Sequence, residues 1–219
     1  MTAQQGTEIK DSVDIPLSIK AGVDVFGPVM YFADRNILTY EGYLSVDLSE
    51  KIGISAFGGY ADFKYSQYNY DYLTKGKYFK AGIDFNILKP EVSAGKYWGG
   101  IGIRYGISNY SYEIPAFSHE NYWGTYQSFV NSTSAWGHFL EVSPGFRARI
   151  FSNFSMGWSI HLRTLLTSGT AKDLRPIYFP GFGKSDSRTS TGISYYFTWS
   201  FTYKNIRVKI KKDAPPPED

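Results

Sequence analysis

Apolar and polar residues alternate along much of this chain. Between residues 17 and 25 the odd positions are apolar and the even ones are polar or glycine, and the same period of two returns at 38–48 and 79–87. A period of two places successive side chains on opposite faces of a strand, so it predicts β-structure. Further stretches bring the expected number of strands to about eight: 52–60, 97–112, 138–150, 154–166 and 190–203.

The connections between the expected strands alternate in length. Short ones lie at 49–51, 88–96 and 152–153, and long ones near 27–37, 64–76, 113–136 and 167–188. Outer-membrane barrels combine short periplasmic turns with long extracellular loops. The pattern therefore predicts an all-β fold, an antiparallel up-and-down transmembrane β-barrel. We expect a periplasmic N-terminal segment at 1–14, the barrel at 15–203, and a basic, proline-rich periplasmic tail at 204–219.

Alternation alone does not say which face points outward, because a soluble lipocalin-like barrel would bury its apolar face. The apolar face of the last strand carries Tyr195, Phe197 and Trp199, and about eight strands enclose too little volume for side chains of this size throughout. Glycine recurs instead on the polar face, for example at Gly82 and Gly106, where it makes room inside a narrow barrel. We therefore expect a lipid-facing apolar exterior, a filled polar lumen and a location in the bacterial outer membrane.

Charged residues on the inward face are expected to pair with one another. Basic and acidic side chains nearly balance there, and charges removed from water are stable only when paired and hydrogen-bonded. The predicted ion-pair network consists of Lys20, Asp24, Glu41, Asp47, Lys80, Asp84, Arg104, Glu141, Arg147, Arg149 and Arg163. His161 is expected to be a hydrogen-bonded lumen residue. The alternative is a stand-alone narrow channel with an ion path lined by Arg104, Arg147 and Arg163.

Composition excludes several classes of function. The chain has no cysteine, so disulfides and cysteine-based metal or redox sites are impossible. Its formal net charge of +3 is too small, and too dispersed, for a nucleic-acid-binding surface. No apolar run is long enough for a membrane helix, and the mean hydropathy is −0.30, so the membrane interpretation depends on the barrel.

Candidate chemistry is sparse. His119, His138 and His161 show no metal-binding spacing, and no nucleophile elbow or phosphate-binding loop is present. Some outer-membrane barrels modify lipids with Ser, His and an acid, which Ser118-His119-Glu120 supplies, but neighbouring residues in a loop usually point apart. We expect no enzymatic activity, cofactor, metal or small-molecule substrate, and keep a lipid-modifying enzyme as the weaker alternative.

Aromatic residues gather in two of the long loops. Tyr122, Trp123, Tyr126 and Phe129 lie in the 113–136 connection, and Tyr178, Phe179 and Phe182 in the 167–188 connection. Exposed aromatics often anchor interfaces, so both loops are candidates for the main partner-binding surface. The alternative is that both loops fold over the barrel mouth and bury these rings.

The alternation changes phase after Tyr203. Ile206, Val208 and Ile210 occupy even positions between basic residues, whereas the preceding apolar residues are odd. A bulge or a separate short periplasmic strand explains the change. A solvated basic tail is the alternative.

Three stretches resemble a known family. These are Gly102–Ser108, the Leu162-Arg163 pair and above all the Ile-Tyr-Phe-Pro-Gly-Phe stretch at 177–182. Together they resemble an uncharacterised family of small outer-membrane β-barrels of Bacteroidota, over about residues 17–203. The resemblance implies a non-enzymatic barrel, an accessory subunit of the outer-membrane barrel-assembly machine. The expected partners are outer-membrane lipid and other envelope proteins in a hetero-complex.

Overall fold

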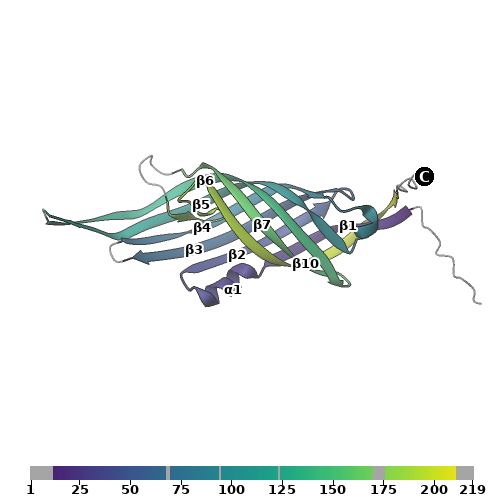
Figure 1. Ribbon diagram of the computed structural model, residues 1–219, viewed down its shortest axis with the longest axis horizontal. Coiled ribbons are helices and arrows are strands. Elements are labelled where there is room, and N and C mark those ends of the chain that lie inside the picture. The colour runs from purple at the N-terminus through teal and green to yellow at the C-terminus, as the bar shows by residue number, and fades with distance from the viewer. Residues whose placement is uncertain (1–11, 68–69, 94, 123, 170–175, 211–219) are drawn as a thin grey trace, which may run out of the picture.

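The computed structural model describes residues 12–67, 70–93, 95–122, 124–169 and 176–210, with the backbone alone at 67, 116–121 and 125–128 (Figure 1). Antiparallel strands form a closed barrel in the order β1-β10-β7-β6-β5-β4-β3-β2. This confirms the predicted fold class and its eight barrel strands. The strands are β1 (Ser12–Asp24), β2 (Ile37–Asp47), β3 (Ile52–Gln67), β4 (Tyr70–Asn86), β5 (Tyr97–Asn121), β6 (Gly124–Phe151), β7 (Phe154–Thr167) and β10 (Thr189–Lys209).

The remaining elements are small. Helix α1 (Phe26–Ala33) follows β1, helix α2 (Pro90–Ser93) lies in a short turn, and β8 (Tyr178–Phe179) pairs with β9 (Gly183–Lys184) in a separate hairpin. Within the described ranges, no helix is both long and apolar enough to cross a membrane.

The barrel exterior is apolar, as the alternation predicts. Leu44, Ile54 and Ile103 leave half or more of their surface exposed on three different strands, and Trp199 does so on β10. Such a belt of large apolar side chains is stable in lipid and not in water. Together with strand closure, it places the chain in the bacterial outer membrane.

The interior is narrow. A Cβ atom at Gly82 would lie 1.9 Å from the carbonyl oxygen of Ile103, and one at Gly106 would lie 2.3 Å from the ring of Phe139. Glycine at these inward positions lets strands and large lumen side chains approach closely. The prediction that glycine marks the lumen face is confirmed at both.

Two of the expected long loops are strands. Strands β3 and β4 run to Gln67 and from Tyr70, and β5 and β6 run to Asn121 and from Gly124. The 113–136 loop is therefore a β-hairpin that extends far beyond the barrel (Figure 1). The prediction of loops at 64–76 and 113–136 is wrong because outward positions such as Lys75 become polar beyond the membrane while inward ones such as Tyr72 and Tyr112 are aromatic and buried, so the lipid-facing apolar series stops although the strands continue.

The phase change near the C-terminus is a β-bulge. Leu17 pairs with Lys204 and Ser18 with Thr202, so Tyr203 is the extra residue. Ile206 and Val208 lie beyond it on β10 and pair with Ile15 and Val13 of β1, which confirms the predicted bulge and shows that the segment continues β10. Ile210 follows the last strand residue. The paired strands thus run past both expected barrel limits, 15 and 203.

The bulge also corrects the position of Leu17. The alternation predicts that Leu17 faces lipid, but Leu17 is buried, with 4% of its surface exposed. Ser18 beside it is buried as well. On β1 the odd-numbered residues up to Leu17 face inward, and from Ser18 onward the even-numbered residues do.

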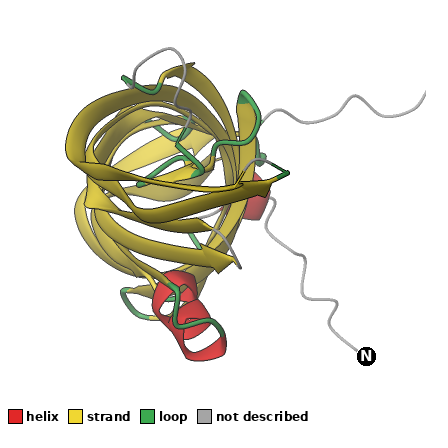
Figure 2. Ribbon diagram, turned by 90° about the vertical axis from the view of Figure 1, so that its left-hand side faces the viewer, coloured by secondary structure: helices red, strands yellow, loops and turns green. Residues whose placement is uncertain are grey.

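The two ends of the barrel differ. One end of the barrel carries the short turns, α2, the start of β1 and the end of β10. The other end carries α1, and the long β5–β6 hairpin extends beyond it (Figures 1 and 2). In outer-membrane barrels the short turns are periplasmic and the long connections extracellular. The right-hand end in Figure 1 is therefore periplasmic.

Candidate functional site: a filled lumen

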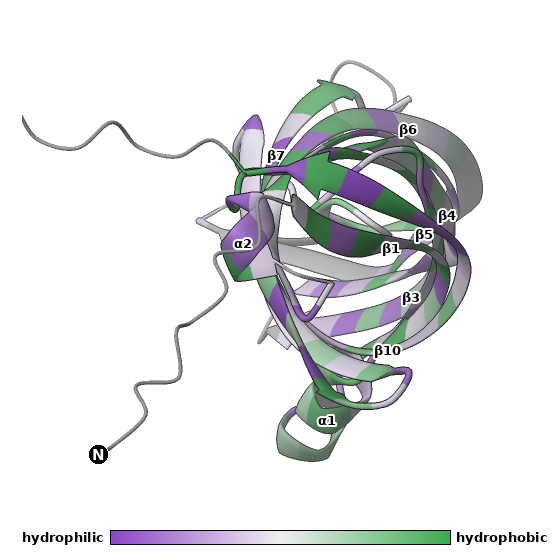
Figure 3. Ribbon diagram, turned by 90° about the vertical axis from the view of Figure 1, so that its right-hand side faces the viewer, coloured by the Kyte–Doolittle hydropathy of each residue, from purple (hydrophilic) through white to green (hydrophobic). Residues whose placement is uncertain are grey.

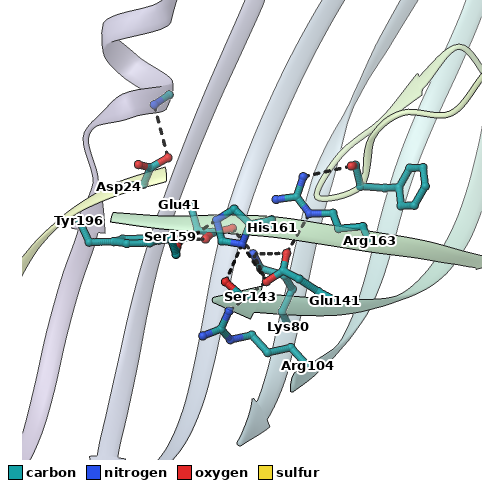
Figure 4. Close-up of polar contacts among 12 residues, drawn as sticks. Asp24, Glu41, Lys80, Arg104, Glu141, Ser143, Ser159, His161, Arg163 and Tyr196 are labelled. Atoms are coloured by element: carbon teal, nitrogen blue, oxygen red, sulfur yellow. Dashed lines mark hydrogen bonds and ion pairs between the residues drawn. The ribbon is translucent and has the colours of Figure 1, made fainter. Parts of the chain in front are cut away.

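Glu141 of β6 lies at the centre of the lumen network (Figure 4). Its carboxylate is within 2.8 Å of Arg163 Nε, 3.1 Å of Arg104 Nη1 and 3.2 Å of Lys80 Nζ. His161 Nδ1 lies 3.2 Å from the same carboxylate. Glu141, Lys80 and His161 are completely buried. One carboxylate thus connects strands β4, β5, β6 and β7 across the barrel.

Further acids complete this network. Lys80 Nζ lies 2.8 Å from Glu41, and Arg104 donates to Asp84 at 2.7 Å. Glu41 in turn accepts a hydrogen bond from the Tyr196 hydroxyl at 2.7 Å. A separate ion pair joins Lys20 to Asp47 nearer the periplasmic end. The structure therefore places Lys20, Glu41, Asp47, Lys80, Asp84, Arg104, Glu141 and Arg163 in ion pairs.

Asp24 departs from the prediction. Its carboxylate accepts hydrogen bonds from the backbone amides of Phe26 and Gly27 at the start of α1, and from Tyr195 of β10. Among the described residues it makes no ion pair. Backbone amides take its oxygens because β1 ends here and the chain turns out of the barrel wall into the helix.

Arg147 and Arg149 also differ from the prediction that they belong to the ion-pair network. Within the described part of the chain, neither lies within ion-pair distance of a carboxylate. Arg147 donates to the Tyr43 hydroxyl at 3.2 Å and lies over the ring of Trp98, whereas Arg149 Nε is buried without an acceptor. The prediction that they belong to the ion-pair network is wrong because the nearby inward acids already pair with Lys20 and Arg104.

An aromatic layer lies on the extracellular side of the network. Phe139, two residues before Glu141 on β6, packs edge to face against Phe179 and Phe182. The rings of Phe179 and Phe182 stack 4.8 Å apart. All three side chains are completely buried. Tyr110 of β5 stacks on Phe179 at 5.3 Å. This packing fills the lumen on the extracellular side of Glu141.

The β8–β9 hairpin carries the two stacked rings into the barrel, and we call it the plug (residues 178–184). The Pro180-Gly181 pair turns the chain, and Gly181 has a φ of +80°, which favours glycine. Arg163 Nη1 donates to the Phe182 carbonyl at 3.1 Å, which ties the plug to the network. Burial raises the pKa of Tyr178 to about 12, so its hydroxyl stays neutral.

The plug corrects one partner-surface prediction. Tyr178, Phe179 and Phe182 are buried in the lumen and are not partner-facing, because a closed barrel of this width offers them an apolar pocket that water does not. Tyr122 and Phe129 on the hairpin are exposed, as is Trp136. Trp123 and the side chain of Tyr126 lie outside the described residues.

Inward aromatic residues below the network were missed. Tyr43, Phe57 and Tyr196 form a buried cluster, and the guanidinium carbon of Arg104 lies 4.3 Å from the centre of the Phe57 ring. The alternation in the sequence does indicate their inward position. Phe57 shares the parity of the other inward residues of β3, and Tyr43 shares the parity of Glu41 on β2.

One set of contacts has the composition of a catalytic triad. Ser159 Oγ lies 3.3 Å from His161 Nε2, and His161 Nδ1 faces both Glu141 and the Ser143 hydroxyl. A triad acid must stabilise a charged imidazole, but three cations already surround Glu141. Glu141 therefore serves the ion-pair network as well as orienting the buried His161. Side chains of 118–120 lie outside the described residues, and no metal-binding group of His, Asp and Glu occurs among the described ones.

A scan against family models matches residues 1–204 to one model, described as a domain of unknown function, DUF6048. The chain belongs to this DUF6048 family. Among curated proteins, no sequence matches.

Solved structures similar to this DUF6048 chain are outer-membrane proteins. Ail, the attachment invasion locus protein of Yersinia pestis, is 10% identical, with a TM-score of 0.41 over 86% of this chain and 99% of Ail. CarO2 of Acinetobacter baumannii is 14% identical, with a TM-score of 0.40 over 87% and 99%. The N-terminal β-barrel domain of Pseudomonas aeruginosa OprF is 14% identical, with a TM-score of 0.32 over 86% and 98%.

Proposed function

We propose that this chain is a non-enzymatic accessory subunit of a larger envelope complex, and that it binds its partner through the extracellular β5–β6 hairpin. The observation that carries the proposal is the combination of a filled lumen with a hairpin that extends beyond the barrel (Figure 1). A barrel packed with buried charges and rings is suited to anchoring in lipid. The hairpin then remains as the element available to other proteins.

The hairpin offers a strand edge. Residues 124–135 of β6 pair with β5 on one side, and no described strand pairs with them on the other, because β7 joins β6 only from His138. Near Trp136 the edge is already covered, since Gly169 approaches its backbone. Free edges accept an added strand from a partner, and backbone hydrogen bonds then supply the affinity.

Exposed aromatic side chains lie on the same hairpin. Phe129 is 67% exposed and Trp136 55% exposed. Large rings held on a rigid strand lose little conformational freedom on binding, which favours them as interface anchors. The family resemblance makes the barrel-assembly machine the first complex to test.

Site-specific photocrosslinking in native outer membranes tests the proposal. A photoreactive residue at Phe129 should give a discrete adduct with another envelope protein. Phe32 of α1 is a matched control, because it is an exposed phenylalanine, 80% accessible, away from the hairpin. Replacing residues 113–132 by an Asn-Gly turn between the paired residues Tyr112 and Thr133 should remove the partner and leave a heat-modifiable barrel. Position 129 giving only uncrosslinked monomer would rule out the hairpin as the docking element.

A further inference from the structure

Two arginines lie side by side on the inward face of β6 at the periplasmic end. Arg147 and Arg149 are two residues apart, which puts their Cβ atoms about 7 Å from each other on one face of the strand. The Arg149 amide donates to the carbonyl of Lys96, which fixes this end of β6 against β5. Like charges on neighbouring positions of one face repel each other.

The neighbouring acids do not compensate this pair. Asp47 accepts from Lys20 and from the Ser18 amide, and Asp84 accepts from Arg104. The guanidinium of Arg147 is held against the Trp98 ring and the Tyr43 hydroxyl, both neutral groups. Among the described residues no ion pair includes either arginine, and the buried Nε of Arg149 has no acceptor.

Both arginines line a cavity in the periplasmic half of the lumen, the end that faces the viewer in Figure 3. Its volume is about 110 Å³, and its remaining lining combines hydroxyl groups such as Ser155 and the amide of Asn86 with apolar side chains such as Phe57. A water molecule needs roughly 10–15 Å³ of such volume, so the space holds several waters or one small anion. Lys51 and Lys96 also line the cavity and add positive charge. The acids in its lining are Asp47, Glu50 and Asp84, of which Asp47 and Asp84 are already paired with Lys20 and Arg104.

We propose that Arg147 and Arg149 bind a small oxyanion, a phosphate or a carboxylate, that enters from the periplasm. Guanidinium groups present paired N–H donors that match the oxygen spacing of these anions, and an anion between the two arginines relieves their repulsion. The small volume excludes a folded polypeptide or a lipid. This site is independent of the proposed docking hairpin, which lies at the opposite end of the barrel.

Titration of the full-length protein in detergent micelles with inorganic phosphate, followed by calorimetry and by phosphorus NMR line broadening, tests the site. Saturable binding of one phosphate with a Kd below about 1 mM is expected. Arg149→Met should weaken it at least about tenfold, and Arg149→Lys, which keeps the charge but loses the paired donors, should weaken it less. Parallel titration with acetate separates the two anion classes, and binding of either supports the proposal.

Arg207→Met is the matched control, because it removes one arginine charge at the same end of the molecule, where Arg207 pairs with Asp14 on the exposed surface. Its affinity for phosphate should stay within about twofold of the parent. Each variant is measured on material that retains heat-modifiable migration. Absence of saturable binding of both anions, unchanged affinity in Arg149→Met, or equal weakening in Arg207→Met would each overturn the proposal.

Discussion

Single residues in the lumen act through charge balance. Glu141 lies within ion-pair distance of three cations on three strands, so its carboxylate contributes more to the stability of the barrel than a single ion pair would. Burial of this group is favourable only while every partner is present, because a stranded charge in a dry interior has no solvent to stabilise it. The network is therefore sensitive to the loss of its central acid.

Glu141→Gln should destabilise the barrel by about 3–5 kcal/mol, because it leaves Lys80, Arg104 and Arg163 with too little negative charge. Urea unfolding in lipid vesicles measures the change. Adding Lys80→Met should recover part of the loss, since the two residues are in direct contact at 3.2 Å. A loss below about 1 kcal/mol, the range of surface ion pairs, would show that the network is solvated.

Residue parity predicted most of this site from sequence. Lys80, Arg104 and Glu141 face inward because their even or odd position on each strand is fixed by the lipid-facing residues around them. Parity does not reveal which inward groups meet. Asp24 is bound by backbone amides and Arg149 has no acid, and both facts depend on the chain path in three dimensions.

Elements were predictable only where lipid imposes a pattern. Inside the membrane one face of every strand must be apolar, so the strands show period two. The β5–β6 hairpin outside the membrane has no such constraint, and the plug depends on a pocket built by other strands. Helix α1 was also missed: its Phe-Gly-Pro-Val-Met-Tyr-Phe-Ala sequence is apolar all round, so it lacks helical periodicity.

The lipid-facing strand surface leads to a second prediction. Ile101 of β5 is exposed midway between the outward aromatic residues Tyr97 and Tyr105, near the middle of the membrane. Ile101→Arg should cost about 2–4 kcal/mol of unfolding free energy in vesicles, because the charge lies in hydrocarbon. Leu48→Arg, beside a periplasmic turn, should cost at most about 1 kcal/mol. Equal costs would place the membrane differently on the barrel.

The plug leads to a third prediction. Phe182→Ala removes a completely buried ring that stacks on Phe179, so local stability should fall by about 3–5 kcal/mol. We expect the plug to open without unfolding of the barrel, so trypsin should cleave after Lys184 at lower temperature in this variant. Phe32→Ala on α1 should change cleavage little. Unchanged cleavage in Phe182→Ala would mean that its ring does not hold the plug.

At the scale of the whole molecule, the lumen consists of stacked layers. A periplasmic hollow of about 110 Å³ and an extracellular one of about 570 Å³ share no lining residue. The periplasmic hollow reaches the ion-pair network at Arg104, and the extracellular one reaches it at Arg163. The completely buried side chains of Lys80, Glu141 and His161 lie between them, whereas the central rings of the aromatic layer line neither hollow. Charge pairing therefore separates the two sides of the membrane.

This closure leads to the last prediction. The intact protein should give no steady single-channel conductance in planar bilayers, because an ion would have to break the Glu141 network to cross. Deleting the plug alone should also leave the barrel closed, since Lys80 and Glu141 still fill the level below it. Plug deletion combined with Lys80→Ser and Glu141→Ser should open a path and give measurable conductance, with heat-modifiable migration confirming that the barrel persists. Conductance by the intact chain would favour the channel function over the accessory subunit.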